Sequence, residues 1–308
     1  MLDFRQTPEY AKYMESIGWI VKRKNGVNYF IKKFPLIGAF IKIQRPEKID
    51  INCIHELIHE YKAFKIIIEP KNSYSKPVIK LIKRYGYSQN RSPFVPTKTI
   101  HIDLRKSERQ LLSEMHYKTR YNIKKSSQNL SIKTQISNDI EKFSEFWQMC
   151  AIKQRGMFLS QKRLITKLYK AFGKKAYLLL VFNLLRNKEG YSVIPKINLE
   201  PNMFDKEIPG RILSAILMVR TKDVAYYTYA ASTKEGKKLF APTLNVWEAI
   251  RLAKKLGCKI FDFEGIYDDR FPLKSWLGFT RFKKSFGGRE IKYPGAFVKY
   301  KYPWEIKV

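Results

Sequence analysis

The segment His55-Glu56-Leu57-Ile58-His59 has the residue types and the spacing of a metal site. Two histidines four residues apart lie on one face of a helix and can hold Zn²⁺, and the glutamate between them can act as a base. A zinc protease also needs a third ligand, and no pattern marks His101, His116 or a remote glutamate for that role. We therefore interpret the segment as an accidental match on an outward helix face and expect no bound metal.

A second group combines basic and aromatic side chains. Tyr117, Arg120, Tyr121 and Lys124 fall on one face of a predicted helix. Such a face suits a phosphate-bearing or nucleic-acid ligand, although an ordinary solvated helix face has the same pattern. The residues by themselves leave both interpretations open.

A third group lies near the end of the chain, where residues 281–301 contain seven basic residues and one acidic residue, Glu290. Phe282 and Phe286 are spaced to anchor this segment, which we expect to be extended, while Lys283 points elsewhere. Gly287-Gly288 permits unusual backbone angles and the close approach of a ligand. A solvated surface strand and turn would also explain the pattern. The chain has no P-loop and no nucleophile-elbow motif.

Helical and strand patterns alternate along the chain, which predicts a mixed α/β or α+β class. In the first part we expect helices and strands in the order helix 7–17, strands 27–32 and 39–43, helix 51–64, strand 65–69, helix 76–84 and strand 97–104. Ser107 and Gln110 then match a capping box, and one helix should continue from there through Ile123.

The second part contains further periodic segments. They predict helices 141–153, 161–172 and 243–256, the last capped by Thr243 and ended by Gly257, and strands 176–184, 212–220, 224–230 and 259–263. The stretch 186–210 contains three prolines and is typical of a hairpin insertion or a surface loop.

Charge is the dominant global property. The 308 residues include 60 Lys and Arg against 27 Asp and Glu, a net charge of +33. Compositional bias towards lysine accounts for about half of this excess. The remainder favours a polyanionic partner, which is nucleic acid, an anionic membrane or a phosphorylated substrate.

The apolar content, 44%, is sufficient for a packed core. No apolar run approaches the ~20 residues that span a bilayer, and the N-terminal residues do not resemble a secretion signal. Cys53, Cys150 and Cys258 are far apart and odd in number, which indicates free thiols in a reducing cytosol. We therefore expect a cytoplasmic protein.

The order of several short motifs resembles the Fem (FemABX) family of peptidoglycan interpeptide-bridge aminoacyltransferases. Residues 118–123 resemble its K-x-R-x-x-I helix, residues 225–232 its aromatic strand, and residues 247–250 the helix that follows. Residues 261–265 resemble its Tyr-Asp-x-x-Gly strand and residues 282–287 its closing motif.

The resemblance implies an α+β fold with mixed sheets, made of two GNAT-like domains side by side without the coiled-coil insertion of some members. The first domain would contain residues 1–104, with the tail 293–308 returning to it, and the second would contain residues 105–292. The implied reaction transfers an amino acid from aminoacyl-tRNA to the stem peptide of a peptidoglycan precursor, lipid II or a UDP-linked muropeptide, without a cofactor. A peripheral contact with the inner face of the membrane would follow from a lipid-linked acceptor.

The resemblance also implies site residues. Lys283 corresponds to the lysine of the transfer step, and Asp262 is the candidate base, with Glu264 or a substrate carboxylate as alternatives. The resemblance implies substrate binding by the following residues: Lys12, Tyr74, Arg120, Tyr229 and Phe282.

Two departures from the family pattern concern the acceptor. The second phosphate-binding arginine aligns with Ser160, so Lys162 or Arg163 would replace it. The double glycine after the aspartate is Glu264-Gly265 here. The alternative functions are an acyl-CoA-dependent N-acyltransferase of the same fold and, next, a non-catalytic basic RNA-binding protein.

Overall fold

The computed structural model describes residues 1–71, 76–184 and 210–301, and within them the chain forms two compact units. Unit 1 comprises residues 1–101, 264–281 and 289–308, and unit 2 comprises residues 102–263 and 282–288. The domains expected from the sequence differ mainly in assigning residues 264–281 to the second part of the chain. Their boundaries stay a prediction, and each unit is described below by itself.

The first sheet has six strands in the order β1-β2-β3-β4-β13-β5. Its strands are β1 (Ile20–Lys24), β2 (Val27–Phe34), β3 (Gly38–Gln44), β4 (Ala63–Glu69), β5 (Ser88–Asn90) and β13 (Ala296–Tyr300). The β3–β4 pair is parallel and the other pairs are antiparallel. The C-terminal strand β13 lies between β4 and β5, so the final described segment completes this sheet.

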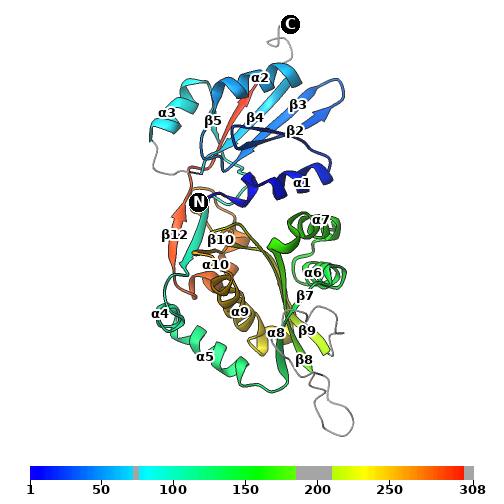
Figure 1. Ribbon diagram of the computed structural model, residues 1–308, viewed down its shortest axis with the longest axis vertical. Helices are drawn as coiled ribbons and strands as arrows, with labels where there is room; N and C mark the ends of the chain where they lie inside the picture. Colours follow the sequence, from blue (N-terminus) through cyan, green and yellow to red (C-terminus); the bar gives the residue numbers. More distant parts are fainter. Residues whose placement is uncertain (72–75, 185–209, 302–308) are drawn as a thin grey trace. The chain divides into compact units, whose positions relative to one another are not determined.

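Two helices, α2 (Ile51–Tyr61) and α3 (Lys76–Arg84), cover one face of the first sheet (Figure 1). Alternate isoleucines of β3 and β4, such as Ile41 and Ile66, point to this face and are fully buried. The Asp50 carboxylate accepts a hydrogen bond from the Cys53 N–H and begins α2. The unit also contains α1 (Pro8–Ser16), preceded by a 3₁₀ turn (Phe4–Gln6).

The second sheet has seven strands in the order β12-β6-β11-β10-β9-β8-β7. Its strands are β6 (Lys98–Asp103), β7 (Ile132–Ser137), β8 (Ala176–Leu184), β9 (Gly210–Arg220), β10 (Val224–Ser232), β11 (Ile260–Asp262) and β12 (Arg289–Lys292). β10 and β11 run parallel, whereas β7, β8, β9 and β10 form antiparallel pairs in succession. Both sheets are mixed, which confirms the α+β class predicted from the sequence.

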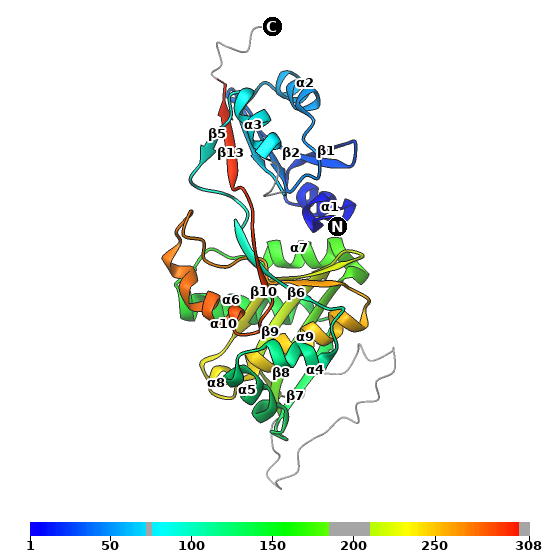
Figure 2. The ribbon, with the colours of Figure 1, turned by 90° about the vertical axis from the view of Figure 1, so that its left-hand side faces the viewer.

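Helices cover both faces of the second sheet in unit 2. Figure 1 and Figure 2 show α6 and α7 on one face and α9 on the other, with α5 packed beside α9. Unit 2 has the following helices: α4 (Glu108–Glu114), α5 (Tyr117–Ser127), α6 (Ile140–Arg155), α7 (Lys162–Phe172), α8 (Lys234–Lys238) and α9 (Ala241–Lys255). A last helix, α10 (Leu277–Lys284), ends in this unit. None of the helices in the described ranges is both long and apolar enough to span a bilayer.

The structure corrects several predicted elements. The single helix expected after Ser107 is two helices, because the Met115 backbone is extended and the His116 N–H donates to the Ser285 carbonyl at 2.9 Å. α9 begins at Ala241 after Phe240, which has φ +58°, and not at Thr243. Most of the predicted loop 186–210 lies outside the described residues.

Candidate active site

Lys283 is buried at the end of α10, with 8% of its surface exposed. Its Nζ donates a hydrogen bond to the Phe263 carbonyl oxygen at 2.7 Å and lies 5.4 Å from the centre of the Tyr227 ring. The segment is helical, so the extended conformation predicted from the sequence is wrong. Neighbouring side chains on a helix still diverge, by about 100°, and Lys284 is exposed.

Aromatic rings form the wall around this amine. The Phe282 and Phe286 ring centres are 5.2 Å apart, and the Phe286 and Phe263 ring centres are 5.7 Å apart. Tyr227 packs edge-on against Phe263, also at 5.7 Å. The predicted anchoring of the segment by two phenylalanines therefore agrees with these contacts. A cation beside aromatic faces in poorly hydrated surroundings interacts more strongly with a nearby negative charge than it would in water.

A turn after Lys283 fixes the end of α10. Gly287 has φ +79°, and a Cβ added there would lie 2.8 Å from the Glu114 carbonyl oxygen. Only glycine combines this backbone angle with this close approach. The glycine of the motif therefore holds α10 against the junction of α4 and α5.

Two other predicted residues lie on neighbouring strands of the same unit. Asp262 ends β11, is 3% exposed and is in register with Tyr226 of the parallel strand β10. Tyr229 follows a bulge in β10 and packs edge-on against Trp147 at 5.6 Å between ring centres. Burial raises the pKa of the Tyr229 hydroxyl, so it is neutral and can donate a hydrogen bond at physiological pH.

The remaining predicted residues of unit 2 lie on helices. Arg120 is exposed on α5 and donates to the Met115 carbonyl, which gives it a structural role at the break between α4 and α5. Lys162, the first residue of α7, forms an ion pair with Glu145 at 3.3 Å. Arg163 is exposed beside it.

The two predicted residues near the N-terminus belong to unit 1. Lys12 is exposed on α1. Tyr74 lies outside the residues that the structure describes. The candidate residues are thus divided between the two units. Within unit 2, Tyr229 and Asp262 lie on the paired strands β10 and β11, and Lys283 of α10 contacts Tyr227 and Phe263, which belong to or follow these strands.

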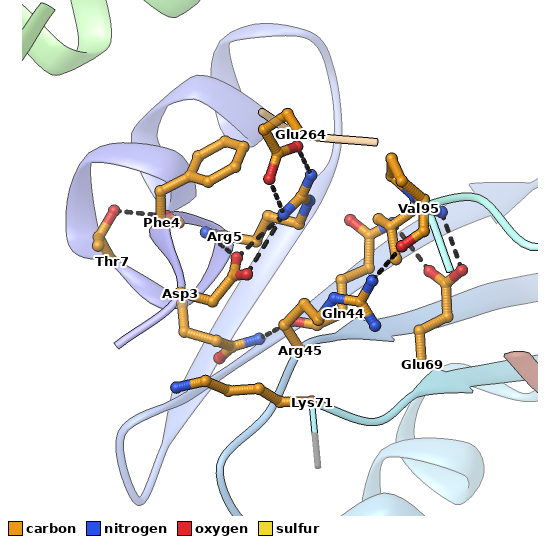
Figure 3. A network of polar contacts seen from close by, with 12 residues as sticks. Asp3, Phe4, Arg5, Thr7, Gln44, Arg45, Glu69, Lys71, Val95 and Glu264 are labelled. Atoms are coloured by element: carbon orange, nitrogen blue, oxygen red, sulfur yellow. Dashed lines mark hydrogen bonds and ion pairs between the residues drawn. The ribbon is translucent and has the colours of Figure 1, made fainter. Parts of the chain in front are cut away.

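Sequence reasoning missed a buried ion-pair cluster in unit 1 (Figure 3). The Arg5 guanidinium lies between Asp3, at 3.1 Å, and Glu264, with which it forms a close ion pair. Burial lowers the pKa of Arg5, but the two carboxylates outweigh this effect and raise it well above its ordinary value. Glu264 occupies the position of a family glycine and has φ +52°. Its engagement with Arg5 argues against Glu264 as the base.

The cluster continues around Glu69, which is fully buried. Its carboxylate accepts hydrogen bonds from the Phe94 N–H at 2.7 Å and the Val95 N–H at 3.0 Å (Figure 3). Arg45 donates to the Pro70 carbonyl at 3.1 Å and stacks on Tyr293 at 3.5 Å from the ring centre. These bonds satisfy buried polar groups and hold the ends of β3 and β4 in place.

Lys42 on β3 is a second residue that the sequence did not mark. Its Nζ lies 4.2 Å from the Trp19 ring centre and 5.8 Å from the Phe30 ring centre. Within the described part of the chain, no carboxylate forms an ion pair with it. Burial lowers the pKa of Lys42 to about 8, and the more distant Glu69 opposes that shift.

The His-Glu-x-x-His segment is part of α2. Glu56 forms an ion pair with Lys24 at 2.9 Å, and the His55 ring packs against Tyr85. Burial and the nearby Lys299 lower the pKa of His55. Positively charged neighbours also disfavour the binding of a divalent metal ion at this segment. Among residues 1–71, 76–184 and 210–301, no group of three His, Cys, Asp or Glu could hold a metal ion. The absence of zinc stays a prediction.

Comparisons with known proteins bear on the family and the fold. The FemAB family model matches residues 193–308. The crystal structure of FemX has a TM-score of 0.78 at 17% identity, covering 97% of this chain and 92% of that chain. A protein of unknown function from Bacteroides thetaiotaomicron has a TM-score of 0.60 at 10% identity, covering 96% of this chain and 90% of that one.

A third structure is the C-terminal domain of a putative lysylphosphatidylglycerol synthetase from Agrobacterium fabrum. It has a TM-score of 0.57 at 9% identity and covers 96% of this chain and 89% of that one. No curated protein matches the chain significantly in sequence. The likeness to these solved structures shows the fold. The FemAB match over residues 193–308, together with the likeness to FemX, supports a relation to the Fem family.

Proposed function

We propose that this protein transfers an amino acid from aminoacyl-tRNA to the stem peptide of a peptidoglycan precursor. The observation that carries the proposal is the buried amine of Lys283, held by the Phe263 carbonyl and the Tyr227 ring. It lies inside the segment that matches the FemAB family and belongs to the closing motif that resembles the family's transfer-step motif.

The proposed reaction is the aminolysis of an ester. The acceptor amine attacks the carbonyl carbon that joins the amino acid to the 3′-terminal ribose of the tRNA. A C–N bond forms, the ester C–O bond breaks, and the ribose hydroxyl leaves. Negative charge develops on the carbonyl oxygen, and Lys283 would stabilise that charge more in the transition state than in the ground state.

The attacking amine must also lose a proton. Asp262 is our candidate to accept it, because it ends a strand of the same unit and is almost completely buried. A carboxylate of the substrate is the alternative acceptor. The rest of the rate enhancement would come from positioning the two substrates.

Both substrates carry phosphates, which suits a net charge of +33. We assign phosphate and sugar contacts to Lys12, Tyr74, Arg120, Lys162 and Arg163, and contacts with the reacting groups to Tyr229 and Phe282. The proposed substrates place the reaction in the bacterial cytoplasm.

One experiment tests the donor and the acceptor together. The protein is incubated with individual labelled aminoacyl-tRNAs and with either lipid II or a UDP-linked muropeptide, and the products are identified by mass. We expect one precursor to gain the mass of one aminoacyl residue, and ribonuclease treatment of the donor to abolish the gain. Equal or better transfer from an acyl-CoA without tRNA would contradict the proposal and favour an acyl-CoA-dependent N-acyltransferase.

A further inference from the structure

Two adjacent apolar side chains in the connection between α6 and α7 are exposed to solvent. Phe158 is 80% exposed and Leu159 is 81% exposed. On the neighbouring helix α6, Met149 and Ile152 are also exposed, at 38% and 39%. Single apolar residues are common on protein surfaces, but two adjacent side chains that are both this exposed at a loop indicate an interaction site.

The loop that carries this pair is held in place by hydrogen bonds. α6 ends at Gly156, which has φ +61°, and its N–H donates to the Ile152 carbonyl. The buried Gln148 side chain then bonds to both ends of the loop. It donates to the Met157 carbonyl at 3.2 Å and accepts from the Gln161 N–H at 2.9 Å. The fold therefore presents Phe158 and Leu159 to solvent instead of folding them inward.

Basic residues flank the apolar pair in the sequence. Lys153 near the end of α6, and Lys162 and Arg163 at the start of α7, are all at least partly exposed. Lys162 is paired with Glu145, whereas no ion pair involves Lys153 or Arg163 among the residues described. An apolar tip flanked by basic residues is complementary to a lipid surface with anionic headgroups.

We propose that the loop Met157–Leu159 inserts into the interfacial layer of an anionic membrane. A protein partner fits less well, because two side chains provide far less than the ~800 Å² per partner that a stable protein interface buries. The same two side chains suffice for weak, reversible anchoring when basic neighbours contribute. Combined with the proposed function, on which this step alone rests, the anchoring favours a lipid-linked acceptor over a UDP-linked one.

The chain offers a matched control. Leu130, in the turn between α5 and β7, is also 81% exposed and belongs to the same unit. Leu159→Ser and Leu130→Ser therefore remove the same side chain at the same exposure. Leu36→Ser tests a second apolar tip, at the turn between β2 and β3.

The variants are compared by cosedimentation with vesicles of equal parts phosphatidylglycerol and phosphatidylcholine, and with vesicles of phosphatidylcholine alone. We expect the parent protein to prefer the anionic vesicles and Leu159→Ser to bind them about tenfold more weakly, with Leu130→Ser unchanged. Equal binding by Leu159→Ser and the parent would overturn the proposal. A loss confined to Leu36→Ser or Leu130→Ser would also overturn it, because the contact would lie elsewhere.

This test is independent of the transfer reaction, since it contains neither tRNA nor precursor. Vesicle binding without any transfer activity would leave the membrane loop supported and the proposed function unsupported. Conversely, transfer to a UDP-linked muropeptide with no vesicle binding would support the function and exclude the membrane loop.

Discussion

At the scale of single residues, the buried amine of Lys283 is the most informative feature. A lysine loses hydration when it is buried, and here a carbonyl oxygen at 2.7 Å and a tyrosine ring at 5.4 Å compensate in part. An amine among aromatic rings in poorly hydrated surroundings interacts strongly with a negative charge that develops beside it.

We expect Lys283→Met to reduce the turnover number about a hundredfold while leaving precursor affinity nearly unchanged. The loss of one oxyanion donor costs on the order of 3 kcal/mol. Lys284→Met is the control, because Lys284 is exposed and points away from Lys283 on α10. Steady-state kinetics and a thermal melt of both variants check the result. Equal losses in the two variants, or a loss of affinity alone, would contradict the assignment.

Lys42 makes stability depend on pH. Its pKa in the folded protein is about 8, below the ordinary 10.5. Between these two values the unfolded chain binds more protons than the folded one, so stability rises with pH. The destabilising effect of the buried charge is therefore complete below pH 8 and disappears towards pH 10.5.

We expect Lys42→Met to raise the free energy of unfolding at pH 7 by on the order of 2 kcal/mol, because the methionine still packs on Trp19 without a charge. The gain should shrink as the pH rises to 10. Urea unfolding of both proteins across this range measures the difference. A difference that does not change with pH would show that Lys42 is not the titrating group.

At the scale of secondary-structure elements, those determined by local sequence signals were predicted better than those that depend on pairing with distant residues. The capping box at Ser107 is present. The Gln110 N–H donates to the Ser107 hydroxyl oxygen at 3.2 Å, and the Gln110 side-chain oxygen accepts from the Ser107 N–H at 2.8 Å. By contrast no strand was predicted at β13, although the resemblance implied that the tail 293–308 returns to the first domain. Its five residues acquire their conformation by pairing with β4, more than 200 residues earlier. The conformation of α10 was also misread, and the contacts that hold its end, from Lys283 and the following Phe286 to Phe263, are likewise not local in the sequence.

The same limit applies to the candidate site. Lys283, Asp262 and Tyr229 could be proposed from the sequence because the motifs that contain them are local. The Arg5–Glu264 pair joins residues 259 positions apart, and no local sequence pattern predicts it. Only the positive φ of Glu264, at a position where the family has glycine, marks the site as unusual.

We expect Arg5→Met to destabilise unit 1 by about 3–5 kcal/mol, because it leaves the Asp3 and Glu264 carboxylates in a poorly hydrated site without the guanidinium between them. Adding Glu264→Gly should restore part of this loss, since it removes one of these two charges and relieves the left-handed backbone. Lys24→Met, which breaks an exposed ion pair with Glu56, should be nearly silent. Denaturant unfolding measures all three. A double variant that is less stable than Arg5→Met would contradict this account.

At the scale of the whole molecule, the excess of basic residues is distributed along the folded chain. α5 is an example, with Lys118, Arg120, Lys124 and Lys125 exposed and no acidic residue in its sequence. Tyr117 and Tyr121 on the same helix are 61% and 58% exposed. Side chains of this kind contact phosphates and bases without reading a specific sequence.

We therefore expect tRNA to bind mainly through its phosphates, so that the logarithm of the affinity falls linearly with the logarithm of the salt concentration. With about four phosphate contacts, a tenfold rise in salt should weaken binding about a thousandfold. Lys124→Glu should reduce the slope, because it removes a cation that forms no ion pair with any described residue. Lys24→Glu should change the slope less, because Lys24 is already paired with Glu56. Fluorescence titration of labelled tRNA at several salt concentrations measures both slopes, and an affinity that is independent of salt would exclude binding through phosphates.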